Sequence, residues 1–180
     1  MAHQSGRWSM ASSTSPLSDD RANLLSRFRI DPNHGFLPGI EPLAQLPSAY
    51  DPWEALVADL PKLLVADRIV EHVAGLPSID ATCLSDREEL ERAMLVLSYI
   101  AHAYVWGTPT PQSQLPASIA VPWLHVAEML NRPPVLSYAS HALFNWRRYD
   151  RSKPPVLGNS ARLLNFGGGE DEDWFVLIHI

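Results

Sequence analysis

One long apolar pattern between residues 85 and 107 constrains the fold more than any other feature of the sequence. Apolar residues recur there every three or four positions, as expected when one face of an α-helix packs into a core. They are Leu90, Ala93, Met94, Leu97, Ile100, Ala101, Tyr104 and Val105. Ser85 and Glu88 predict a capping box at the start, and Gly107 predicts the end. The pattern therefore predicts a long core helix.

Shorter helices are predicted on both sides of this segment. Asp51 as N-cap, Pro52 in the first turn and Glu54 closing a capping box predict a helix that reaches Leu60. Further helices are expected over residues 61–75, 122–131, 135–150 and 170–180, with Arg147 and Arg148 in the last turn of the third. Apolar and polar residues do not alternate with period two over several segments, as they would in a β protein, so the sequence predicts an all-α protein.

Composition excludes several classes of function. Hydrophobic residues make up 46% and charged residues 19% of the chain, which predicts a folded domain. The net charge of −6 offers no basic field for nucleic acid. Cys83 is the only cysteine, which excludes an internal disulfide or a cysteine-based metal cage and favours a cytoplasmic protein. No apolar stretch reaches the roughly 20 residues that span a bilayer, so no membrane partner is expected.

Two local motifs do not support the chemistry they first suggest. FGGGEDED, at 166–173, has the glycines of a phosphate loop, but carboxylates follow them where a basic residue is needed. Seven histidines suggest a metal, yet none pairs with another at i+3 or i+4 on a helix. A flexible turn and mostly structural histidines are therefore the simpler interpretations.

Tyr138, His141 and Ala142 share one face of a predicted helix, at positions i, i+3 and i+4. A tyrosine and a histidine beside a small residue can line a pocket, because pockets are mostly apolar with a few polar groups. Simple packing explains the same spacing. His179, between Ile178 and Ile180, is likewise consistent with a core histidine on spacing alone.

Four stretches follow, in order, the pattern of one known family. They are GFLPGIEPLAQLPSAYDPWEALVADLP, LERAMLVLSYIAHAYVWG, LPASIAVPWLHVAEMLNRPPVLSYASHALFNW and NFGGGEDEDWFVLIHI. The most specific pieces are PPVLSYA with NW seven residues after its tyrosine, and a Phe-Gly-Gly turn followed by an aromatic pair. From about Phe28 to Ile180 the chain resembles the indoleamine 2,3-dioxygenase family of haem enzymes.

The resemblance implies a fold in two parts. In such proteins a small N-terminal helical domain covers the distal face of a haem b that a larger C-terminal helical domain holds. The implied division is a flexible tail at 1–24, a small distal domain at 25–155, and a linker with the first helix of an incomplete haem domain at 156–180. The proximal histidine of the family would lie beyond Ile180, so no metal ligand is expected in this chain. The missing haem-domain half is an expected partner.

The resemblance also implies an activity and a site. Such enzymes insert both atoms of dioxygen across the C2–C3 bond of an indole, giving N-formylkynurenine from tryptophan in the kynurenine pathway of tryptophan catabolism. Tyr138, His141, Ala142 and Phe175 are the implied substrate-binding residues, and His179 is the implied catalytic residue. Dioxygen and tryptophan or another indole are the expected partners, and this chain alone is expected to be inactive.

Two positions depart from the vertebrate pattern, which has cysteine at 141 and serine at 179. His179 would be a stronger hydrogen-bond partner than serine for an indole N–H or for oxygen. Two alternatives therefore stay open beside the dioxygenase. One is a haem enzyme that modifies tryptophan in natural-product biosynthesis, and the other is a non-catalytic helical binding or interaction module.

Overall fold

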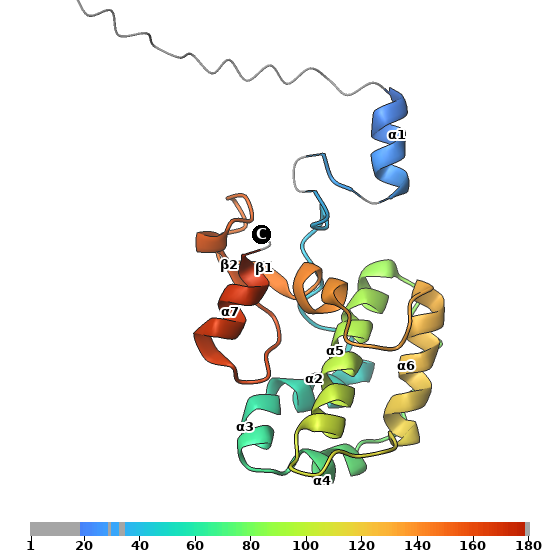
Figure 1. Ribbon diagram of the computed structural model, residues 1–180. Coiled ribbons are helices and arrows are strands. Elements are labelled where there is room, and N and C mark those ends of the chain that lie inside the picture. Colours follow the sequence, from blue (N-terminus) through green and yellow to red (C-terminus); the bar gives the residue numbers. More distant parts are fainter. Residues whose placement is uncertain (1–18, 29, 33–34, 179–180) are drawn as a thin grey trace, which may run out of the picture.

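Helix α5 (Arg87–Trp106) is the central element of the computed structural model, which describes residues 19–28, 30–32 and 35–178. Four helices surround it: α2 (Asp51–Ala58), α3 (Leu60–Val65), α4 (Ile69–Ala74) and α6 (Ala117–Leu130). Helix α6 runs along one side of α5, and α2, α3 and α4 pack against the rest of it (Figure 1). Helix α1 (Asp19–Arg27) lies apart from this bundle (Figure 1). The prediction of a mainly helical fold is confirmed.

Buried side chains surround α5 on all sides. Almost every residue of this helix between Leu90 and Ala103 is buried, because neighbouring helices cover its whole circumference. The largest fully buried partners from other elements are Trp53, Leu60, Ile69, Val73 and Ile119. No helix in the described ranges is both long enough and apolar enough to cross a membrane.

Both predicted capping boxes differ from the observed helix starts. Asp51 is the first residue of α2, which follows a 3-10 turn, and its side chain caps nothing. Glu54 points into the core instead, where it accepts a hydrogen bond from the Leu46 amide at 2.9 Å. The N-cap of α5 is Asp86 rather than Ser85, and its carboxylate accepts from the Glu88 amide at 2.9 Å.

Two predicted helices have different bounds. The segment 61–75 divides into α3 and α4, because Asp67 between them has φ 53°, in the left-handed region that a continuing helix does not use. The helix predicted from Pro122 begins five residues earlier, at Ala117, so Pro122 lies inside α6. Pro122 has no backbone N–H and so removes one hydrogen bond of the helix. Burial of Trp123 and Val126 against α5 stabilises the helix in spite of this loss.

The single helix predicted over 135–150 is wrong. The chain makes a short π-helical turn, η2 (Ala139–Leu143), and then strand β1 (Trp146–Arg148). Strand β1 pairs antiparallel with β2 (Ser160–Arg162), which follows the 3-10 turn η3 (Leu157–Asn159) in the predicted linker. Arg148 forms a 2.8 Å ion pair with Glu41 rather than ending a helix.

Helix α7 (Gly169–Leu177) packs against both β2 and η2, and it lies beside the hairpin in Figure 1. Its buried residues Val176 and Leu177 pack with Trp146 of β1 and with Leu37 of the segment between α1 and α2, forming a second small core. These contacts cross the predicted boundary between residues 155 and 156, and the domain division stays a prediction.

The predicted tail at 1–24 overlaps the first described helix. Helix α1 begins at Asp19, so residues 19–24 are helical. The remainder of the predicted tail, residues 1–18, lies outside the described ranges.

Candidate functional site

Three of the predicted site residues come together where α7 packs against η2. The centroid of the Phe175 ring lies 6.1 Å from that of the Tyr138 ring, and the two ring planes are nearly perpendicular, at 86°. The Phe175 and His141 ring centroids lie 5.8 Å apart, with 41° between the planes. Such tilted and edge-to-face pairs are the attractive arrangements of aromatic rings. Tyr138 is 48% and Phe175 is 47% exposed, so this aromatic cluster of Tyr138, His141 and Phe175 has an open face.

The other two predicted site residues are placed differently. Ala142 follows His141 in η2, but its side chain is fully buried, so it packs inside the fold rather than on the open face. His179 lies outside the described residues, and the structure gives no position for it. The functional roles of all five residues stay predictions.

A buried tyrosine of α5 lies behind the aromatic cluster. The Tyr99 hydroxyl lies 2.9 Å from His141 Nδ1, and the two rings stack with centroids 5.8 Å apart at 20°. The Phe166 ring also stacks on Tyr99, at 4.2 Å and 13°. Tyr99 has no exposed surface, so the cluster rests on the core helix through this contact.

Asn145 connects the end of η2 to the chain that leads into α7. Its Oδ1 accepts from the Leu164 amide at 2.7 Å, and its Nδ2 donates to the Leu164 carbonyl at 2.9 Å. The same Nδ2 donates to the Tyr99 hydroxyl at 2.9 Å. Asn145 is fully buried, and these bonds satisfy both ends of its amide.

An ion pair holds the turn between β2 and α7. Arg162 Nη1 lies 2.8 Å from Glu172 Oε1, and both side chains are largely buried. The Glu172 carboxylate also accepts from the amides of Phe166 at 3.1 Å and Gly168 at 2.9 Å. Gly167 has φ 96°, which favours glycine in this turn. One carboxylate in the first turn of α7 therefore orients the turn that carries Phe166.

Burial favours the neutral form of both polar rings of the site. Desolvation lowers the pKa of His141 below its usual value, while the charge of Glu172 opposes this shift and Arg162 adds to it. Desolvation also raises the pKa of Tyr99, and the charge of Glu172 adds to the effect. Neutral His141 has one nitrogen that donates and one that accepts a hydrogen bond.

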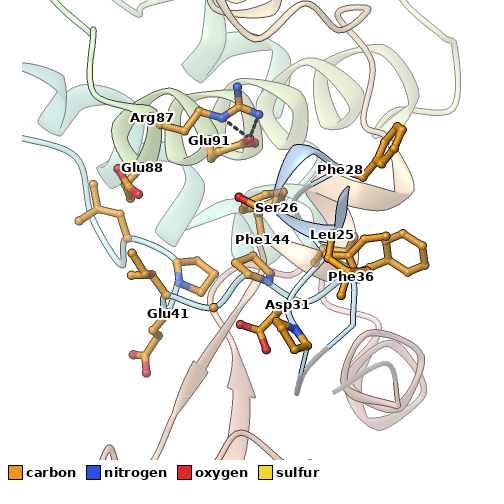
Figure 2. A pocket seen from close by; sticks show the side chains of 18 of the residues that line it. Leu25, Ser26, Phe28, Asp31, Phe36, Glu41, Arg87, Glu88, Glu91 and Phe144 are labelled. Carbon is orange, nitrogen blue, oxygen red and sulfur yellow. Dashed lines mark hydrogen bonds and ion pairs between the residues drawn. The ribbon is translucent and has the colours of Figure 1, made fainter. Parts of the chain in front are cut away.

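A separate groove lies between α1, the segment that joins α1 to α2, and the start of α5 (Figure 2). It encloses about 710 Å³, has Phe28 and Phe36 among its walls, and carries a 2.8 Å ion pair of Arg87 with Glu91. Of the predicted site residues that the structure describes, none lines it. The aromatic cluster remains the better candidate, because exposed aromatic rings meet a buried polar network there.

The open face of the cluster suits a flat apolar group. Ile178, three positions after Phe175 and so near it on α7, is 45% exposed and adds aliphatic surface next to the aromatic ring. Among the described residues, no group of three His, Cys, Asp or Glu side chains could hold a metal ion. The described side chains of the site can therefore contact a planar apolar group but do not themselves form a metal site.

Sequence reasoning missed the residues behind the aromatic cluster. Tyr99 does not belong to the apolar pattern of its helix, although a buried tyrosine needs a hydrogen-bond partner and so signals a polar neighbour. Asn145 and Phe166 occur in the recognised NW and Phe-Gly-Gly motifs, but no contact between them and Tyr99 follows from spacing. Arg162 and Glu172 show no local pairing signal, because they are ten positions apart across a turn.

Comparison with known proteins identifies the family. The sequence model described as "Indoleamine 2,3-dioxygenase" matches residues 24–180. Indoleamine 2,3-dioxygenase of Saccharomyces cerevisiae is 40% identical over 166 residues, covering 87% of this chain and 37% of that protein. Indoleamine 2,3-dioxygenase 1 of Mus musculus is 37% identical over 172 residues, covering 94% of this chain and 42% of that protein.

A human relative shows the same pattern. Indoleamine 2,3-dioxygenase 2 of Homo sapiens is 33% identical over 156 residues, covering 86% of this chain and 38% of that protein. The chain spans about two fifths of the length of the curated relatives it matches. Because the family model covers most of its residues, the chain belongs to the indoleamine 2,3-dioxygenase family.

Proposed function

We propose that this chain is the distal part of a haem-dependent dioxygenase that cleaves the indole ring of tryptophan or a related indole. One observation carries the proposal beyond family membership. Helix α7 brings Phe175 against Tyr138 and His141, three residues from two distant segments, and leaves their aromatic face open. A flat, mostly apolar ligand with one or two polar atoms fits such a surface.

Each residue has a distinct part in this proposal. Phe175 and Tyr138 pack against the indole ring and exclude water from it, because aromatic rings contribute large apolar area with fixed geometry. Neutral His141 offers a hydrogen bond beside them. Buried Ala142 leaves room for these larger side chains. The catalytic role of His179 rests on the sequence resemblance alone.

The proposed cofactor is haem b, whose iron supplies the activation of dioxygen when bound. The proximal iron ligand is proposed to come from a further haem-binding part, since this chain spans only about two fifths of its relatives. We expect the chain alone to be inactive. The product from tryptophan would be N-formylkynurenine in the kynurenine pathway, and a cytoplasmic setting accords with Cys83 being the single cysteine.

The test is turnover by the complete protein that includes this chain. Purified protein is assayed for bound haem and for dioxygen-dependent conversion of tryptophan under reducing conditions, with products identified by mass spectrometry. N-formylkynurenine as the product supports the proposal. An oxidised tryptophan with an intact ring would favour the biosynthetic alternative, and a protein without haem or turnover would favour the binding module.

A further inference from the structure

A chain of buried hydrogen bonds leads from the loop before α7 to His141. Its members are the Leu164 backbone, the Asn145 side chain and the Tyr99 hydroxyl, and each successive contact is between 2.7 and 2.9 Å. Asn145 and Tyr99 have no exposed surface, so water does not compete for these bonds. The direction of each bond therefore follows from the donors and acceptors that the side chains possess.

The Leu164 backbone determines the orientation of the Asn145 amide. The Leu164 N–H can only donate, so the oxygen of Asn145 must face it, at 2.7 Å. The Leu164 carbonyl can only accept, so the nitrogen of Asn145 faces that group, at 2.9 Å. The nitrogen that lies 2.9 Å from the Tyr99 hydroxyl is therefore a donor, and the Tyr99 oxygen accepts from it.

The single proton of the Tyr99 hydroxyl then has two possible acceptors. The Leu164 carbonyl is 3.4 Å away, long for a bond between two oxygens, and it already accepts from Asn145. His141 Nδ1 is 2.9 Å away. The shorter contact assigns the proton to the bond with His141, so Nδ1 is the acceptor and Nε2 carries the hydrogen.

We infer that Tyr99 and Asn145 are positioning residues that lock His141 in the tautomer with a protonated Nε2, so that the site offers a hydrogen-bond donor to an acceptor atom on its ligand. Nδ1 and Nε2 lie on opposite sides of the imidazole, and Nε2 forms no hydrogen bond within the described part of the chain. His141 also contacts Phe175, on which the ligand is proposed to pack. This inference rests on the proposed function for the nature of the ligand, an indole compound. The indole ring itself has only a donor N–H, so the acceptor atom is one that the compound carries in addition, as a substituent or as a nitrogen in place of a ring C–H.

The tautomer is measured directly in the 180-residue chain. Long-range ¹H–¹⁵N NMR correlation of ¹⁵N-histidine distinguishes the two neutral tautomers, and loss of one signal set in His141→Gln assigns His141. Near pH 8 we expect an unprotonated Nδ1 and a protonated Nε2. In Tyr99→Phe, which lacks the hydroxyl, we expect a mixture of tautomers.

Tyr104→Phe is the matched control, because Tyr104 lies on the same helix and its hydroxyl bonds no other described residue. This variant should leave the His141 spectrum unchanged. A protonated Nδ1 in the unsubstituted chain would overturn the inference whether or not Tyr99→Phe folds. An unchanged tautomer in folded Tyr99→Phe would overturn the part assigned to Tyr99.

The ligand preference is tested in the complete haem-containing protein with indole and the four isomeric azaindoles. Each azaindole replaces one ring C–H by a nitrogen acceptor at nearly constant shape. We expect at least one isomer to bind roughly twofold to twelvefold more tightly than indole, the range of one net hydrogen bond. Tyr99→Phe should remove that advantage, and no advantage for any isomer would overturn the donor role of His141.

The two measurements separate this inference from the proposed function. If His141 has a protonated Nε2 but neither tryptophan nor any indole binds, the proposed function fails and the hydrogen-bond chain stands. If indoles bind but His141 has a protonated Nδ1, the hydrogen-bond chain fails and the proposed function stands.

Discussion

A buried ion pair between α2 and α5 makes a strong prediction about stability. Arg92 Nε lies 2.9 Å from Glu54 Oε1 and Arg92 Nη2 lies 2.5 Å from Glu54 Oε2, with side chains only 4% and 8% exposed. Glu54 also accepts from the buried Leu46 amide. Arg92 Nη1 has no hydrogen-bond acceptor among the described residues, so the guanidinium depends on the two bonds to this carboxylate.

Glu54→Met should therefore lower the free energy of unfolding by about 3–5 kcal/mol, because it leaves the Arg92 charge buried without a partner. For a chain of this size the midpoint of thermal unfolding should fall by roughly 10 °C. Glu54→Met combined with Arg92→Met should be more stable than Glu54→Met alone, since no charge then remains buried. The Leu46 amide still loses its acceptor in both, which costs about 1–3 kcal/mol.

Urea and thermal unfolding followed by circular dichroism measure these differences. The matched control is Glu71→Met, which removes the same group from an exposed pair with Arg68 and should leave the midpoint unchanged. A Glu54→Met variant as stable as the unsubstituted chain would refute the reasoning. The reasoning would also be refuted if the double variant lost as much free energy of unfolding as Glu54→Met and Arg92→Met lose separately, added together.

Two further predictions concern packing and pH. Gly107→Ala should destabilise the fold by about 1–3 kcal/mol in urea unfolding, because its new Cβ would lie 2.3 Å from the Ala103 carbonyl oxygen and 2.4 Å from Leu64 Cδ2. Gly158→Ala, in open space, should be neutral. Burial raises the pKa of Glu41, but the hydrogen bond from Arg148 and the charges of Arg148 and Arg151 together outweigh burial, and the net shift is downward. The associated stability is present above pH 4.5 and is lost as pH falls through the lowered pKa, so Glu41→Gln should flatten this part of an acid-unfolding profile.

The sequence predicted the core helix well and the short elements poorly, for physical reasons. The apolar residues of α5 recur within the segment itself, so the helix could be predicted locally, whereas the period alone indicated one buried face and the structure buries α5 on every side. The hairpin depends on Asn145 meeting Leu164, nineteen positions away, and no local pattern indicates that contact. Glu54 matched a capping box, but an ion pair with Arg92 outweighed the cap.

The candidate site shows the same division between local and distant signals. Tyr138 and His141 both lie near Phe175, although a π-helical turn replaces the predicted helix and Ala142 is buried inside. The approach of Phe175 depends on how α7 packs, and only the family resemblance indicated it. Tyr99 was found from the structure alone, because its hydrogen bond to His141 crosses from one element to another.

The most direct test of the proposed site is the dissociation constant for tryptophan in the complete haem-containing protein, compared with that of Phe175→Ala. Loss of one aromatic wall should weaken binding roughly tenfold or more with haem content unchanged. Tyr149→Ala, which removes a 70% exposed aromatic ring outside the cluster, should bind as the unsubstituted protein does. Equal affinity in Phe175→Ala and the unsubstituted protein would contradict the assignment of the aromatic cluster as the indole site.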